Sequence, residues 1–505
     1  MKKGLRKIGT ITKYYPFVEQ TIMNLLDTTL YDADDFQDFM TRLRKIVSDV
    51  DADESLVHIA AFLAHYLDDI KMIDVLTNRH ANMLSAKPWI IVDRESKATE
   101  NRGQLDAIDK LLASDPDDWI ALQAHLFKAD LLYLVPESFD SLFAAKNLIE
   151  ANPKLDCFND WVYLTEILLR RYEGDVKRVS VLREKALKKS REYNDPLSEL
   201  AILTQQTEFM MNIDITRAME FTQTAHVLAS ELGVPRLKTE AIQGVGMVST
   251  VLGEYDLALH AWIESVEELQ TQGAPECHSY IRIAQLYADL GESENALEWA
   301  KMAMEVDAKS ARPGGLDDHI CPHVAMANAL IVAGMLDKAE KYIEKSREIA
   351  LRSGQELLLS MHYYVQGLFE IASGDAISGL DTITRALEIS ERIDGHPARL
   401  NRFLLALTRA EVELFESQGR SELDPCDSGP WMHRLEHESR KNGLLGIQMQ
   451  HALLKAEFQE KLGLPDVAME TLESALSIHD SPGVITLRKQ ILSKIQELKE
   501  RPLSI

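Results

Sequence analysis

The chain has 505 residues, 46% of them hydrophobic and 27% charged, and its 55 basic and 80 acidic residues give a formal net charge of −25. This composition argues against an intrinsically disordered protein, and the excess of acid disfavours general binding to nucleic acid because the surface repels phosphate. The four cysteines lie far apart and form no C-x-x-C pair, which argues against a disulfide framework or a cysteine-rich zinc module.

The extreme N-terminus is a basic segment, with five basic residues before the first acid, Glu19. It is expected to be either a solvated tail or a small contact for an acidic partner or a membrane surface. No stretch approaches the roughly 18 apolar residues of a transmembrane helix, and the start of the chain lacks the apolar core of a signal peptide. We therefore expect a cytoplasmic protein with no membrane span.

Apolar residues recur at helical spacing from residue 14 to residue 95 without clear repeat punctuation. Residues 1–95 are therefore expected to form an N-terminal bundle of helices, of unknown function. The polar run Asp93–Gln104 is the boundary that the sequence favours. Within the bundle, His58, His65 and Asp69 share one helix face, a pattern more typical of a polar stripe or a satisfied histidine pair than of a metal site.

Paired helices follow, and helix-helix turns recur about every 40 residues through the last two thirds of the chain. The turns centre on Gly174, Ile213, Gly253, Gly291, Gly334, Gly374, Gly419 and Gly463. A unit of this length cannot bury its own apolar face, so neighbouring units must stack to make a continuous core. Residues 96–480 are therefore predicted to form an all-α solenoid of about eight to ten repeats.

The clearest repeat runs from residue 278 to residue 307. Its first helix carries aromatic and small residues, its turn is Leu290-Gly291-Glu292, and its second helix is rich in alanine around Trp299. This pattern resembles the tetratricopeptide repeat family, although the interval is longer than the 34 residues most common there. The resemblance implies a right-handed superhelix. After Ser481 and Pro482, an amphipathic helix within residues 481–505 is expected to cap the open edge of the last repeat.

In this family the first helix of each repeat lines the concave face, which implies a partner-binding surface here. The residues that match these positions are Gln243, Met247, His278, Ile281, Gln285, Val324, Asn328, Met361, Tyr364 and Leu368. Amide side chains on such a face can bind the backbone of an extended peptide, while the apolar ones receive its side chains. The alternative for each of these residues is simple packing between repeats.

Two patterns suggest a metal. His433, Glu436 and His437 match H-x-x-E-H, in which two histidines hold zinc and the glutamate activates water, but the pattern needs a third protein ligand in the short remaining chain. A second cluster joins Asp317, Asp318, His319, Cys321 and His323. Because Pro322 is typical of the first turn of a helix, capping by the aspartates is favoured over metal binding.

The sequence thus favours a non-enzymatic scaffold or adaptor that needs no cofactor and binds a peptide or a partner protein on a concave face. The alternative is a ligand- or peptide-sensing regulatory module whose N-terminal bundle is the output surface. A zinc hydrolase built on His433, Glu436 and His437 is a third and weaker possibility. The oligomeric state stays open.

Overall fold

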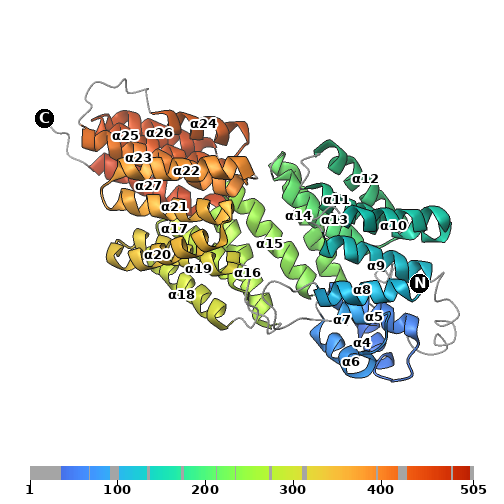
Figure 1. The fold of residues 1–505 in the computed structure, drawn as a ribbon. Coiled ribbons are helices and arrows are strands. Elements are labelled where there is room, and N and C mark those ends of the chain that lie inside the picture. Colours follow the sequence, from blue (N-terminus) through green and yellow to red (C-terminus); the bar gives the residue numbers. More distant parts are fainter. Residues whose placement is uncertain are drawn as a thin grey trace. The chain divides into compact units, whose positions relative to one another are not determined.

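A computed structural model describes most of the chain. The described residues are 36–67, 69–90, 102–132, 137–171, 176–211, 213–233, 235–271, 276–309, 316–393, 396–418, 429–478 and 481–500. Within them the chain forms α-helices and two short 3-10 helices, without a strand (Figure 1). The backbone divides into two compact units: residues 1–206 with 221–241, and residues 207–220 with 242–505. None of the described helices is long and apolar enough to span a membrane.

The first unit contains the helices from α4 to α12 and most of α13, whose last residues, from Thr207, belong to the second unit. Their bounds are α4 Phe36–Ile46, α5 Glu54–Tyr66, α6 Ile70–His80, α7 Lys87–Ile90, α8 Arg102–Ala113, α9 Asp118–Leu131, α10 Glu137–Ala151, η1 Pro153–Phe158, α11 Asn159–Arg171, α12 Val176–Glu192 and α13 Pro196–Met210. Helices α14 (Ile215–Leu232) and α15 (Pro235–Leu252) each contribute residues to both units.

The helical region predicted before residue 95 contains α4 to α7, and the apolar residues predicted before residue 36 lie outside the described residues. One hydrophobic core continues from Phe39 through α8, α9 and later helices of the first unit. The core therefore extends past the polar run at residues 93–104. The division at residue 95 stays a prediction.

His58 in this core is a satisfied histidine. Its Nδ1 lies 2.7 Å from the Ser85 carbonyl oxygen and its Nε2 lies 2.7 Å from Gln123 Oε1. Asp69 caps α6 by accepting a hydrogen bond from the Met72 amide at 3.0 Å. The stripe of His58, His65 and Asp69 is thus used in packing and capping.

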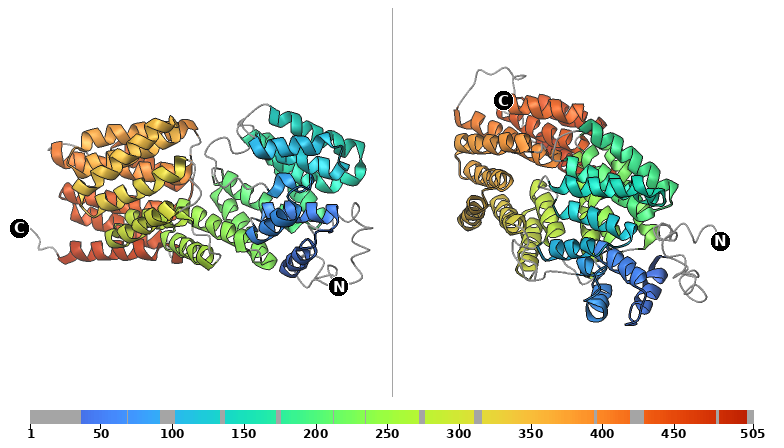
Figure 2. Two further views of the ribbon diagram at one scale, coloured as in Figure 1. Left: turned by 60° about the horizontal axis from the view of Figure 1, so that its bottom comes forward. Right: turned by 45° about the vertical axis from the view of Figure 1, so that its right-hand side comes forward.

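The second unit continues with stacked helices. Their bounds are α16 Tyr255–Thr271, α17 Cys277–Asp289, α18 Ser293–Lys309, α19 Leu316–Val332, α20 Leu336–Ser353, α21 Glu356–Ala372, α22 Ala376–Ile393, α23 Pro397–Gln418, α24 Pro430–Lys441, α25 Leu445–Lys461, α26 Pro465–Ile478, η2 Pro482–Val484 and α27 Ile485–Glu500. Each odd-numbered helix from α17 to α25 packs against the even-numbered helix that follows it, and the pairs stack in sequence (Figures 1 and 2).

The predicted turns fall between the members of these pairs. Gly253, Gly291, Gly334, Gly374 and Gly463 all have a positive φ, which glycine adopts without steric cost, and Ile213 lies in the turn between α13 and α14. Gly174 and Gly419 lie outside the described residues. The helix-turn-helix solenoid is therefore confirmed.

The two ends of the second unit meet, because α23 and α25 reach back to α15, α16 and α17. The Asn401 Nδ2 donates to the Val251 carbonyl oxygen at 3.2 Å, and the Tyr255 hydroxyl donates to Gln450 Oε1 at 2.9 Å. At the closest approach, a Cβ added to Gly446 would lie 1.8 Å from the Gly253 carbonyl oxygen, so no side chain fits there. The sequence analysis did not anticipate this closure.

The predicted capping helix is α27. Leu487, Ile491 and Ile495 are buried, and α27 packs against α25 and α26. It also continues the closure, because the backbone N–H of Thr486 donates to Asp256 Oδ2 at 2.9 Å and Gln490 Nε2 donates to the Leu290 carbonyl oxygen at 2.8 Å. The last helix thus covers the final repeat and binds the first repeats of its own unit.

Candidate functional site

The ten residues predicted for the concave face lie in the second unit on α15, α17, α19 and α21. Ile281 and Val324 are 4% and 3% exposed and belong to its hydrophobic core, while Met247, Met361 and Leu368 pack against that core. For these five residues, contacts between repeats account for the apolar side chain. Their role in binding stays a prediction.

Tyr364 is also covered. Its ring stacks on Phe403 of α23 with 4.9 Å between the ring centroids, and burial followed by the charge of Asp289 raises the pKa of its hydroxyl. Gln243 joins two repeats by donating to Ser279 Oγ at 3.2 Å. Both of these polar side chains therefore make contacts within the second unit.

Asn328 differs from them. It is 5% exposed, and no described residue forms a hydrogen bond with its amide. It lies seven residues after Cys321 on α19, so the two side chains share one helix face. Helices α17 and α19 pack against each other, and Cys321 acts on the pKa of Arg282 of α17. Asn328 therefore lies on the face of α19 that also includes Cys321.

A cluster of arginines lies inside the second unit, and the sequence analysis missed it. Gln285 Oε1 accepts from Arg282 Nη1 at 3.4 Å and from Arg402 Nη1 at 3.2 Å. Arg402 also donates to Asp289 Oδ2 through Nε at 3.0 Å and Nη2 at 2.7 Å. Arg399 stands one turn before Arg402 on α23. We call Arg282, Arg399 and Arg402 the inner arginine cluster.

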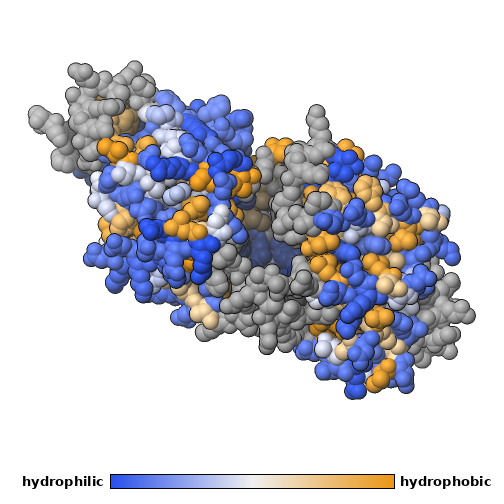
Figure 3. Space-filling model, in the orientation of Figure 1, coloured by the Kyte–Doolittle hydropathy of each residue, from blue (hydrophilic) through white to orange (hydrophobic). Residues whose placement is uncertain are grey.

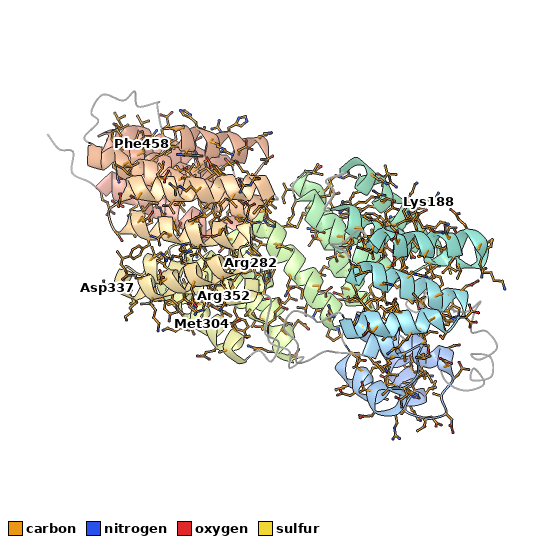
Figure 4. All side chains as sticks on the ribbon, viewed as in Figure 1. Lys188, Arg282, Met304, Asp337, Arg352 and Phe458 are labelled. Carbon is orange, nitrogen blue, oxygen red and sulfur yellow. The ribbon has the colours of Figure 1, made fainter. Side chains whose placement is uncertain are left out.

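Burial and neighbouring charges shift the pKa values of the groups in and around this cluster. Burial, then the charges of Arg402 and Arg399, lowers the pKa of Arg282 to about 10, so the guanidinium stays charged at neutral pH. Burial, then the charge of Arg282, lowers the pKa of His278 to about 3, which keeps that ring neutral. Burial opposes the charge of Arg402, but Asp289 outweighs it and raises the Arg402 pKa. Figure 4 labels Arg282 of α17 together with Met304 of α18 and Asp337 of α20.

A weak sequence signal for this cluster existed. His278, Arg282, Gln285 and Asp289 follow one another at spacings of four, three and four residues, which places a polar stripe on one face of a largely buried helix. The other half of the cluster comes from α23, and Arg402 is 113 residues away from Asp289. Only the closure of the second unit brings the two halves together.

The H-x-x-E-H match lies on α24. Glu436 uses its two carboxylate oxygens on cations: Oε1 lies 2.8 Å from Arg440 Nη2 and Oε2 lies 3.8 Å from Lys455 Nζ. The same Oε2 lies 4.0 Å from Nε2 of His451, which is on α25. Among the residues that the structure describes, no group of three or more His, Cys, Asp and Glu side chains is arranged to hold a metal ion.

The second candidate metal cluster lies at the start of α19. This helix begins at Leu316, so Pro322 stands inside the helix and not in its first turn, and the expectation was wrong on this point. The side chains of Asp317, Asp318 and His319 lie outside the described residues. Cys321 is a free thiol, as are Cys157 and Cys277.

No known family model and no curated protein match the chain. Solved structures of similar fold include a Rap protein complexed with competence and sporulation factor (13% identity, 68% of this chain and 98% of that chain, TM-score 0.41). Others are NprR with its cognate peptide NprX (16%, 68% and 94%, TM-score 0.46) and yeast Tom70 (14%, 88% and 95%, TM-score 0.33). These likenesses are too distant to carry a function. The stacked helix pairs make this chain an all-α helix-turn-helix repeat protein, the architecture that the resemblance to tetratricopeptide repeats implied.

Proposed function

We propose that the second unit is a non-enzymatic interaction module that binds a peptide or a segment of a partner protein along its first helices. The single observation that carries the proposal is Asn328, a residue that is 5% exposed and whose amide reaches solvent without a hydrogen-bond partner among the described residues. An amide that has no partner within the fold is available to a ligand, and a peptide backbone offers both a donor and an acceptor for it.

The net charge of the chain favours one kind of partner, and its thiols favour one cellular compartment. With a net charge of −25, the chain repels nucleic acid, so a protein or peptide partner is favoured. Hydrophilic residues dominate the face shown in Figure 3, with hydrophobic residues scattered among them. The free thiols of Cys157, Cys277 and Cys321 suit a reducing cytoplasm, which is the location we propose.

The test is retention of peptides from a synthetic random-sequence octapeptide library on the immobilised full chain. We expect Asn328→Ala to reduce retention by about tenfold, the effect of one lost buried hydrogen bond. The matched control is Asn295→Ala on α18, where the amide already donates to Glu292 Oε2 at 2.6 Å. Equal retention by Asn328→Ala and the wild type would place binding elsewhere, and no retention above bare resin would end the proposal.

A second candidate function is sensing, in which ligand binding in the second unit alters the first. The observation that favours it is the continuity of α14 and α15, each of which contributes residues to both units. A sensor should change its radius of gyration in small-angle X-ray scattering when a retained peptide is added. An unchanged radius of gyration would leave the adaptor as the better description.

A further inference from the structure

A cavity lies among three helices near the end of the second unit. Helix α25 packs against both α24 and α26 (Figure 1), and residues of all three helices line a cavity of about 290 Å³. One water molecule needs only about 15 Å³ of such a volume, so the cavity has room for a small organic molecule. None of the ten residues predicted for the concave face lines it.

His451 of α25 lines this cavity without a hydrogen-bond partner among the described residues. The residue is 6% exposed, and its Nε2 is buried and unpaired. This nitrogen lies 4.0 Å from Glu436 Oε2, which is beyond hydrogen-bond length. Burial lowers the pKa of His451 to about 4, although the charge of Glu436 opposes it, so the ring is neutral near pH 7. An unpaired buried imidazole costs the fold stability, and a molecule bound in the cavity would supply a partner.

The charged groups beside His451 approach one another without forming a hydrogen bond. Lys455 Nζ lies 3.8 Å from Glu436 Oε2, and its ammonium forms no hydrogen bond with a described residue. Glu436 Oε1 contacts Arg440 Nη2 at 2.8 Å, whereas Oε2 is the oxygen that approaches Lys455 and His451. Lys455 and Glu436 Oε2 therefore keep hydrogen-bonding capacity for an atom that contacts them both.

The charges that line the cavity cancel, which limits the ligand that it would take. Two acids, Glu436 and Glu470, and two bases, Arg440 and Lys455, line it, and the neutral His451 ring adds no charge. A simple anion such as phosphate would face both carboxylates, and a metal cation would face both bases. A small ligand that carries one positive and one negative group meets opposite charge at both.

The remaining walls favour a short, uncharged side chain on that ligand. Ala452 and Ala475 are buried and line the cavity, and Val467 is exposed at its edge. The hydroxyls of Ser439 and Thr471 already donate within the fold, to the Glu436 carbonyl oxygen at 3.2 Å and to Gln459 Oε1 at 2.8 Å. A third charge on the ligand would thus lie against apolar atoms without a partner.

We propose that this cavity binds a free neutral α-amino acid in its zwitterionic form. The ammonium of Lys455 binds the α-carboxylate of the ligand, Glu436 accepts a hydrogen bond from its α-ammonium group, and the His451 ring forms a third hydrogen bond. The side chain of the ligand lies against Ala452 and Ala475. This proposal does not rest on peptide binding, because it concerns other residues and a different ligand.

The test is isothermal titration calorimetry of the full chain with each of the uncharged proteinogenic α-amino acids. We expect at least one of them to bind with a Kd below about 1 mM. Each amino acid that binds is then compared with its N-acetyl derivative, which lacks the ammonium group, and with its amide, which lacks the carboxylate. Both derivatives should bind at least about tenfold more weakly, because each leaves one charged group of the cavity without an opposite charge.

Two variants test which residues bind the two ends of the ligand. Lys455→Met and Glu436→Gln should each weaken binding of the free amino acid by about tenfold, because each removes one charged contact. The matched control is Lys345→Met on α20, where the lysine is paired with Glu348 at 2.8 Å outside the cavity, and it should bind as the wild type does. Thermal unfolding of each variant identifies any loss of fold. The comparison of derivatives uses the wild type and needs no variant.

The outcomes that would overturn this proposal leave the proposed function standing. No binding of any uncharged amino acid would overturn it, and so would equal binding by the wild type, Lys455→Met and Glu436→Gln. Equal binding of a derivative blocked at both ends would assign the cavity to a peptide segment, and tighter binding of inorganic phosphate would assign it to an anion. Peptide retention is measured separately through Asn328→Ala, which should leave amino-acid binding unchanged.

Discussion

Each unit buries one carboxylate among several cations, and the two clusters differ in how completely the charges pair. In the first unit, Glu166 is 2% exposed and lies 2.6 Å from Lys146, 2.9 Å from Arg170 and 3.0 Å from Arg178. In the second unit, Asp289 contacts Arg402, while Arg282 has neutral neighbours. All three cations reach the acid in the first cluster, whereas in the second no described carboxylate lies within 4.0 Å of Arg282.

The difference indicates separate roles for the two clusters. Burial opposes the charge of Glu166, but hydrogen bonds from Lys146 and Arg170 outweigh it and lower its pKa, so this cluster is complete within the chain. In the inner arginine cluster, the hydrogen bonds of Arg282 among the described residues go to the neutral acceptors Gln285 and His278. Incomplete compensation of buried charge is typical of binding and active sites, where function limits stability.

The largest effect is expected when the carboxylate is removed from the second unit. Asp289→Asn leaves Arg402 buried beside Arg282 without an acid, and should lower the free energy of unfolding by about 3 kcal/mol. Hydrogen exchange in α17 and α23, measured at increasing urea, reports this loss. Glu166→Gln should cost less because Lys146 and Arg178 are partly exposed, and a larger loss for Glu166→Gln would contradict the comparison.

A smaller loss is expected from Gly446→Ala. The added methyl group would meet the Gly253 carbonyl oxygen, so the junction between the first and last repeats must shift. We expect a loss of about 2 kcal/mol, typical of overpacking, with faster hydrogen exchange in α25 and α27 and unchanged exchange in the first unit. Gly463→Ala is a useful reference, since open space surrounds Gly463 and only its positive φ is strained. An effect of Gly446→Ala no larger than this reference would argue against the closure.

Acid should destabilise the second unit through its buried histidines. Burial lowers the pKa of His278 to about 3 and that of His362 to about 4, while an unfolded histidine titrates near 6.5. Between pH 6.5 and 4 the unfolded chain therefore binds more protons than the folded chain. Stability is fully present above pH 6.5 and falls by up to about 1.4 kcal/mol per pH unit for each such histidine.

The check is the urea midpoint for hydrogen exchange in α17, measured from pH 7 to pH 4. His278→Gln should flatten its decline, because the variant has no imidazole to protonate at this position. A midpoint that stays constant across this range in the wild type would show that these histidines do not titrate as buried groups.

The local part of the fold could be predicted from the sequence. Turn glycines such as Gly291 and Gly374 mark a backbone conformation that glycine favours, and the alanine-rich second helices mark close packing. The closure could not be predicted, because it depends on a small rotation at each repeat that adds up over the whole unit. The contact between Gly253 and Gly446 joins residues from distant repeats, and neither has a side chain that reveals it.

Only part of the candidate site could be predicted from the sequence, because the rest depends on the closure of the second unit. Matching to the repeat pattern led to Gln285 and Asn328, which lie on the helices that carry the proposed binding face. The same matching included Ile281 and Val324, which the structure places in the hydrophobic core. It omitted Arg282, next to a predicted residue, because a charged side chain on a helix is usually solvated. The excess of charge around Arg282 becomes visible only with α23 in place.

The smallest expected effect is the change in stability caused by Arg282→Gln. Its sign is informative, because it shows whether the arginine stabilises or destabilises the fold. Arg282→Gln removes a charge that no described carboxylate pairs with, so it should raise the urea midpoint for hydrogen exchange in α17, by about 1 kcal/mol of stability. Arg385→Gln on the exposed face of α22 should leave that midpoint unchanged. A lower midpoint for Arg282→Gln would show that the arginine stabilises the fold and would contradict the difference between the two clusters.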